Sequence, residues 1–211
     1  MNRMRQIPTL FVLLSLFLIG CQLEKKQTSP PNIVLFFVDD MGWQDTSVPF
    51  WDQPTNFNKT YKTPNMERLA KKGVKFTNAY ATPVCSPTRV SLMTGMNAAR
   101  HRVTNWTLQP DKLQPMELNH PTLAFPDWNY NGIGLEAATP NTAYAKPLPQ
   151  LLSEKGYFTL LAGKAHFGAI DYPSSNPINL GFQVNIAGHA AGAPESYLGR
   201  ENFGNGKEGK E

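Results

Sequence analysis

The chain has 211 residues and a mass of 23.5 kDa, enough for one ordinary domain or for part of a larger one. Hydrophobic residues make up 41% and charged residues 17%, which excludes a disordered tail and a coiled coil, and two cysteines are too few for a disulfide framework. Arg3 and Arg5 lie in an expected leader, and without them the chain has 18 basic and 16 acidic groups, so its net charge is small. The sequence has no run of Lys and Arg that would indicate a nucleic-acid partner.

The N-terminus has the pattern of an export signal. Arg3 and Arg5 precede an apolar run, residues 10–19, that is too short to span a bilayer and fits the core of a secretory signal. The run ends in LIGC, which resembles a bacterial lipobox with Cys21 as the lipidated residue; the alternative is an ordinary signal peptide with an incidental cysteine. We expect a signal peptide over residues 1–20 and a polar tether over residues 21–31. The protein is then expected to be an exported lipoprotein that is periplasmic or anchored in the outer membrane.

Three apolar runs predict strands. Residues 33–38 (IVLFFV) are continuously apolar, which is typical of a strand buried on both faces of a parallel sheet. Residues 74–80 and 157–162 are the other candidates. Because these runs alternate with helical patterns, the sequence predicts an α/β fold with a mostly parallel sheet flanked by helices.

Helix signals separate these runs. Thr63 and Pro64 are typical of a helix start, and the stripe that follows, Met66, Leu69 and Ala70, predicts a buried face. Further helices are expected over residues 86–96 and 148–155. Between them, residues 97–145 read mostly as loop, and a loop of that length is more often functional than accidental. No strong element is expected after residue 171.

Polar clusters follow each predicted strand. They are Asp39 with Asp40, the segment 85–89, and the segment 163–166. Ligands of open α/β sheets bind at the carboxyl edge of the strands, so we expect these clusters to meet there although they are far apart in sequence.

The segment CSPTR at residues 85–89, followed by Thr94 and Gly95, resembles the sulfatase signature C-x-P-x-R with T-G further on. The likeness extends to residues 31–34 and 39–43, which are similar to the family's opening strand and aspartate pair. The segment GKAHFG at residues 163–168 is similar to the family's G-K-W-H-x-G block, with Ala165 in place of Trp. The resemblance implies an alkaline-phosphatase-like α/β domain over residues 32–211, present as its N-terminal part only.

The resemblance also implies roles for individual residues. Cys85 would be oxidised by a separate maturation enzyme to formylglycine, whose hydrate is the nucleophile of sulfate ester cleavage. Arg89 would neutralise charge near the nucleophile, Lys164 would bind sulfate, and His166 would hydrogen-bond the formylglycine hydroxyl. The substrate would be a sulfated small molecule or glycan.

A metal site is implied by the same resemblance. Asp39, Asp40 and the formylglycine made from Cys85 would hold one divalent cation, with calcium expected because it takes hard oxygen ligands. Nothing in residues 171–211 resembles the family's later metal ligands, so the chain alone is expected to lack part of the active site and to be inactive.

Three functions remain open from the sequence. The first is a sulfuric ester hydrolase. The second is a phosphonate or phosphate ester hydrolase of the same superfamily, and the third is a non-catalytic lipoprotein that binds sulfated glycans. The other histidines, His101, His120 and His189, have no partner that the sequence identifies.

Overall fold

The computed structural model describes residues 29–113, 120–124 and 127–190, together with residues 196, 198 and 200. The expected signal peptide and the expected lipidation site Cys21 lie outside the described residues, as does most of the tether. The chain divides into two units, Met1–Phe37 and Val38–Glu211. Within the described part, no helix has the length and apolar character needed to cross a membrane.

The prediction of a buried strand over residues 33–38 is wrong for this structure. The segment is extended but carries no ladder, and Val34 and Phe36 are 89% and 85% exposed. The second predicted strand, residues 74–80, likewise forms no ladder, with Tyr80 90% exposed. An apolar run becomes a buried strand only where another strand pairs with it and helices cover it, and among the described residues no strand pairs with either run.

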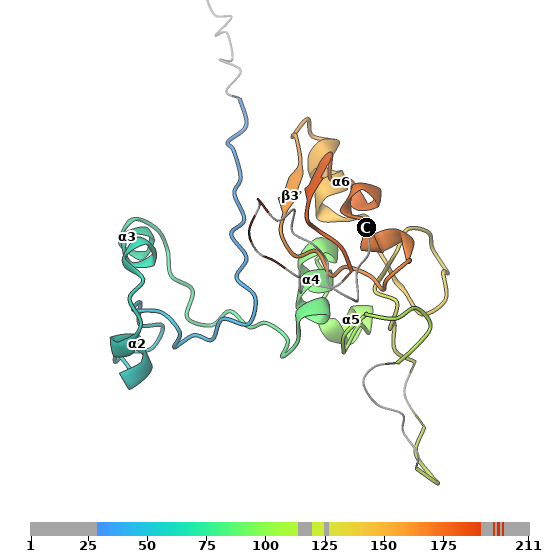
Figure 1. The fold of residues 1–211 in the computed structure, drawn as a ribbon, viewed down its shortest axis with the longest axis horizontal. Coiled ribbons are helices and arrows are strands. Elements are labelled where there is room, and N and C mark those ends of the chain that lie inside the picture. The colour runs from blue at the N-terminus through green and yellow to red at the C-terminus, as the bar shows by residue number, and fades with distance from the viewer. Residues whose placement is uncertain are drawn as a thin grey trace, which may run out of the picture. The chain divides into compact units, whose positions relative to one another are not determined.

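Helix α4 (Cys85–Thr94) is the centre of the core. Val90 is fully buried and Met93 is 6% exposed, and both pack with Val103, Ile133 and other buried apolar side chains. The helix ends at Gly95, whose left-handed φ of 69° is ordinary for a glycine in that place. It packs against the short helix α5 (Ala98–His101) and against α6 (Leu148–Ser153), as Figure 1 shows.

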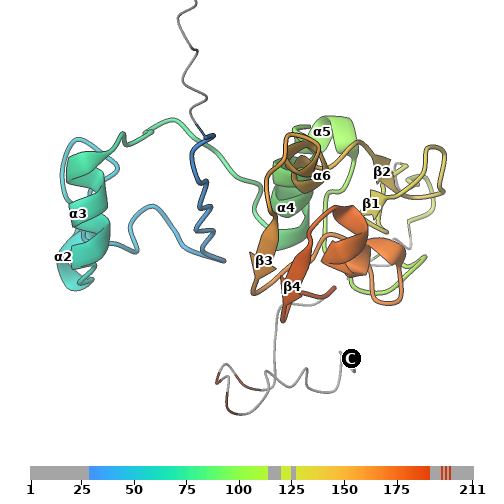
Figure 2. The same cartoon turned by 90° about the horizontal axis from the view of Figure 1, so that it is seen from above.

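All observed strand pairs are parallel. Strand β3 (Leu160–Ala162) pairs with β4 (Val184–Ile186), and β1 (Ile133–Gly134) pairs with β2 (Ala143–Tyr144). Figure 2 shows β3 and β4 side by side. The predicted strand at residues 157–162 is therefore confirmed at its carboxyl end, whereas β4 was not expected because its three residues carry no periodic signal.

The chain between β3 and β4 is held by two short 3₁₀ helices, η1 (Pro173–Ser175) and η2 (Pro177–Leu180). Leu180 is 1% exposed and belongs to the same core as α4. The rings of Phe167 and Phe182 stack with centroids 6.3 Å apart, which joins the segment after β3 to the segment before β4. The parallel register, in which Ala162 pairs with Ile186, places the carboxyl ends of β3 and β4 beside each other.

Helices α2 (Asn56–Thr60) and α3 (Pro64–Lys72) form a local arrangement of their own. The α3 helix begins at Pro64 as predicted, and Thr63 accepts a hydrogen bond from the Ser47 N–H at 2.9 Å. The predicted buried face of α3 is wrong, since Leu69 is 72% exposed and no residue of α3 is buried.

Candidate active site

Cys85 is the first residue of α4. Val84 before it is extended, so the helix begins abruptly and Cys85 lies at the end where backbone N–H groups have no partner within the helix. Thr82 and Thr88 fasten this junction: the Thr82 N–H donates to Thr88 Oγ1 at 3.0 Å, and the two hydroxyls lie 2.5 Å apart. The half-buried thiol of Cys85 is therefore held at a site that favours negative charge.

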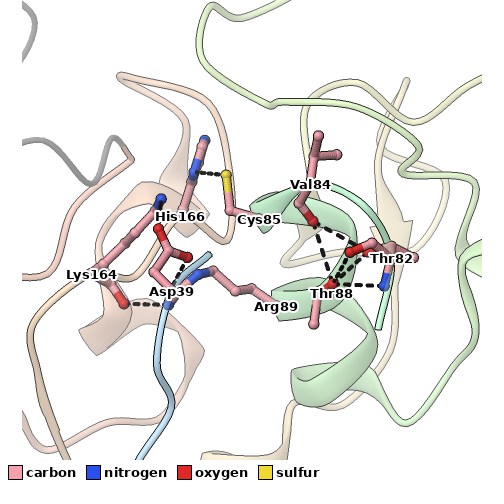
Figure 3. A network of polar contacts seen from close by, with 8 residues as sticks. All are labelled: Asp39, Thr82, Val84, Cys85, Thr88, Arg89, Lys164 and His166. Carbon is pink, nitrogen blue, oxygen red and sulfur yellow. Dashed lines mark hydrogen bonds and ion pairs between the residues drawn. The ribbon is translucent and has the colours of Figure 1, made fainter. Parts of the chain in front are cut away.

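His166 is brought to the same place by β3. The strand ends at Ala162, and the chain turns through Gly163, with φ of 100°, and His166, with φ of 52°. A left-handed φ is uncommon for a residue with a side chain and persists only where surrounding contacts fix it. Here the His166 N–H donates to the carbonyl oxygen of His189 at 3.0 Å, just beyond β4. Nδ1 of His166 lies 3.3 Å from Cys85 Sγ (Figure 3).

His166 is uncharged at ordinary pH. Burial of the imidazole, together with the positive charges of Lys164 and Arg89, lowers its pKa to about 3. The charge of Asp39 acts in the opposite direction and does not outweigh them. Nε2 of His166 is buried and has no hydrogen-bond partner among the described residues. One nitrogen of the ring therefore faces position 85, and the other is buried without a hydrogen bond among the described residues.

Arg89 and Lys164 converge on Asp39. Arg89, one turn after Cys85, donates from Nη2 to Asp39 Oδ1 at 2.9 Å and from Nη1 to the Lys164 carbonyl oxygen at 2.7 Å. Lys164 Nζ donates to Asp39 Oδ2 at 2.5 Å. Partial burial alone would raise the pKa of Asp39, but the hydrogen bonds and charges of Lys164 and Arg89 hold it below its ordinary value. Figure 3 shows the carboxylate between the two cations.

The expected calcium ligands are not assembled into a closed shell. Both oxygens of Asp39 already accept from cations, and Asp40 is exposed in a turn with φ of 56°. Nowhere in the described part of the chain do three or more His, Cys, Asp or Glu side chains gather as metal ligands would. Calcium takes six to eight oxygen ligands, so the described arrangement does not fit a calcium site. Asp39 acts here as the counter-ion of Arg89 and Lys164.

The structure thus brings together five of the six residues that the sequence indicated for the active site: Asp39, Cys85, Arg89, Lys164 and His166. Asp40 is left outside this cluster. Sequence reasoning missed Thr82, which fixes the start of α4, and His189, whose carbonyl oxygen holds His166. His189 contributes a backbone atom, so its side chain gave no signal, and β4, which ends three residues before it, carries no sequence signal either.

Comparisons with known proteins assign the chain to a family. The family model described as Sulfatase matches residues 31–205. N-acetylgalactosamine-6-sulfatase of Mus musculus is 33% identical over 154 residues, which cover 72% of this chain and 24% of that protein. Steryl-sulfatase of Homo sapiens is 34% identical over 146 residues, 69% of this chain and 20% of that protein. A protein named Sulfatase from Formosa agariphila is 37% identical over 98 residues, 46% and 18% of the two chains.

The chain belongs to the sulfatase family. It spans about a quarter, or less, of the length of these curated relatives. The α/β class predicted from the sequence is confirmed by the family match together with the observed helices and parallel strands.

Proposed function

We propose that this chain carries the nucleophile and the sulfate-binding cations of a sulfuric ester hydrolase. The observation that carries the proposal is the contact between Cys85, at the start of α4, and the uncharged His166, with Arg89 and Lys164 beside them. The sulfatase names of the relatives support the same reaction class. The substrate would be a sulfated small molecule or a sulfated glycan.

Cys85 stands in for the formylglycine that a separate maturation enzyme would make from it. The position fits that group, because an oxygen in place of Sγ would lie within reach of Nδ1 of His166 and at a helix N-terminus. When present, a hydrated formylglycine supplies one hydroxyl to attack sulfur and a second to expel sulfate as the carbonyl re-forms. The thiol itself is not the proposed nucleophile.

The chain's own residues would bind the sulfate group and move a proton. Lys164 and Arg89 bear two positive charges against the single charge of Asp39, which leaves a net attraction for an anion. Lys164 is the more accessible of the two, with a side chain 19% exposed against 6% for Arg89, so Lys164 is assigned to the substrate and Arg89 to the site next to Cys85. Uncharged His166 would exchange a proton with the group at position 85 through Nδ1.

We also propose that the protein is exported and anchored through a lipid on Cys21. The support is the sequence alone: two arginines, a short apolar run and the LIGC segment. The test is membrane fractionation of the wild type and Cys21→Ser. The wild type should sediment with membranes and the variant should become soluble after export, whereas a wholly soluble wild type would indicate an ordinary signal peptide.

The test of the reaction class compares matched aryl sulfate and aryl phosphate esters. The protein is co-expressed with a formylglycine-generating enzyme and assayed both as given and with any sequence that its gene encodes beyond residue 211. The aryl sulfate should be hydrolysed faster than the phosphate, and Cys85→Ala should abolish turnover. Preference for the phosphate would indicate a phosphate ester hydrolase. Absence of turnover in every form, with formylglycine present, would indicate a binding protein.

A further inference from the structure

Thr107 is hydrogen-bonded to the start of α4. Its N–H and its Oγ1 both donate to Oγ of Ser86, at 3.2 Å and 3.3 Å. Ser86 is the residue next to Cys85, and both Ser86 and Thr107 are 0% exposed. A single buried hydroxyl therefore receives two hydrogen bonds from one residue of the long connecting segment.

The next residue along that segment contacts the other half of the site. The carbonyl oxygen of Leu108 accepts from the N–H of Ile170 at 2.8 Å, four residues after His166. The intervening chain is fixed as well, because the Ile133 N–H donates to the carbonyl oxygen of Phe167 at 2.9 Å. Thr107 thus bonds to the start of α4, and its neighbour Leu108 bonds to the segment that follows His166.

The hydrogen bonds of Thr107 and Leu108 form a bridge between two parts of the site that are far apart in the sequence. Cys85 and His166 are 81 residues apart in sequence, yet their side chains meet at 3.3 Å. The distance between them depends on how α4 is held relative to the segment after β3. Displacements near 1 Å between reacting groups can change rates by about a hundredfold, so a short buried bridge between the two elements has a functional consequence.

We infer that Thr107 is a positioning residue that sets the separation of Cys85 and His166 by holding Ser86. The inference rests on the proposed function in one respect, that Cys85 is the precursor of the nucleophile. It assigns a role to the connecting segment that the sulfatase signature does not contain. None of the hydrogen bonds among the described residues joins Thr107 to the thiol or the imidazole. Thr107 acts through Ser86 on one side and through Leu108 and Ile170 on the other.

The test uses residues 1–211 with Cys21→Ser, in which Cys85 is the one remaining thiol. Thr107→Val removes the hydroxyl with little change of shape, and Thr107→Ser keeps it. Thr46→Val is the matched control, because Thr46 is also 0% exposed and its hydroxyl donates to the Val48 carbonyl oxygen at 3.1 Å. Three quantities are measured: the rate of Cys85 alkylation by iodoacetamide, the imidazole NMR resonances of the four histidines, and stability in urea.

Thr107→Val should speed alkylation by about threefold or more and shift the resonances of His166, since a loosened helix start exposes the half-buried thiol and moves it from Nδ1. Thr107→Ser should match the parent, and Thr46→Val should leave both readouts unchanged. The inference is overturned if Thr107→Val loses stability while alkylation and the His166 resonances stay as in the parent, or if Thr107→Ser behaves like Thr107→Val.

These readouts need neither formylglycine nor ester hydrolysis. A chain without sulfatase activity would contradict the proposed function and leave the positioning result in place. Conversely, an unaffected Cys85 in Thr107→Val would overturn the inference and leave the proposed function to its own assay.

Discussion

Sγ of Cys85 lies 3.3 Å from Nδ1 of His166, and the imidazole is uncharged because its pKa is lowered to about 3. The thiol comes from the first residue of a helix and the imidazole from a turn after a strand. Burial of the ring among the cations Lys164 and Arg89 is the main reason that it stays neutral. A neutral imidazole can accept a proton from a hydroxyl at position 85, which a charged one could not do.

The counter-ion role of Asp39 predicts a loss of stability in Asp39→Asn. The side chain of Arg89 is 6% exposed, so it would keep a buried charge with a weaker partner. Asp39 is 33% exposed, and solvent screening reduces the effect to about 1–2 kcal/mol, measurable by urea unfolding. Glu154→Gln, which weakens the exposed ion pair with Lys146, should change stability by less than about 0.5 kcal/mol. Equal effects in the two variants would contradict the role given to Asp39.

The buried His101 should make the free energy of unfolding depend on pH. Its Nδ1 accepts from the Val103 N–H at 3.0 Å and its Nε2 lies 2.8 Å from Ser91 Oγ, so the folded ring is neutral with the proton on Nε2. Burial lowers its pKa from the ordinary 6.5, opposed by a hydrogen bond to the Pro87 backbone. Below about pH 6.5 the unfolded chain then binds more protons than the folded one, so stability falls as the pH falls.

Urea unfolding between about pH 7.5 and pH 5.5 checks this dependence. The loss of stability on acidification should be smaller in His101→Gln than in the wild type, with His166 responsible for part of what remains. The exposed His120 provides the control, and His120→Gln should leave the loss unchanged. A His101→Gln variant with the wild-type pH dependence would show that this ring is not held neutral by the fold.

Gly132 is predicted to tolerate no side chain. Its φ of 83° is left-handed, and a Cβ there would overlap the Phe167 carbonyl oxygen and lie 2.7 Å from Cα of Gly168, both of them backbone atoms. We expect Gly132→Ala to destabilise the chain by about 1–3 kcal/mol and to shift the resonances of His166, which directly precedes Phe167. Gly73→Ala, where one backbone oxygen lies at 3.3 Å, is the milder control. Unchanged stability in Gly132→Ala would contradict this packing.

The sequence predicted those features whose causes are local. Helices α3 and α4 have proline near their starts, and both begin within a residue of the expected position. Strand pairing is non-local, so the apolar runs 33–38 and 74–80 indicated strands that find no partner among the described residues. The clustering of Asp39, Cys85 and His166 was predicted from the rule that polar residues after parallel strands meet at one edge, although of the three expected strands only the one before His166 is paired in the described part of the chain. The bond from His166 to a backbone carbonyl was not, because every residue has such an oxygen.

The occupied carboxylate of Asp39 predicts weak calcium binding by the 211-residue chain. A cation would have to compete with Lys164 and Arg89 for Asp39, and water would have to supply most of its six to eight ligands. Isothermal titration with calcium should show no stoichiometric binding at micromolar concentrations. Stoichiometric micromolar binding that Asp39→Asn abolishes would show that the site closes around the metal despite the arrangement described.

The central claim is that Cys85 is the precursor of a formylglycine nucleophile. The most direct measurement is mass spectrometry of the tryptic peptide spanning residues 76–89, from chain expressed with a formylglycine-generating enzyme. We expect the thiol of Cys85 to be replaced by an aldehyde, and an aldehyde-reactive probe to label the wild type but not Cys85→Ala. An unmodified thiol in a host that matures another sulfatase at the same time would contradict it.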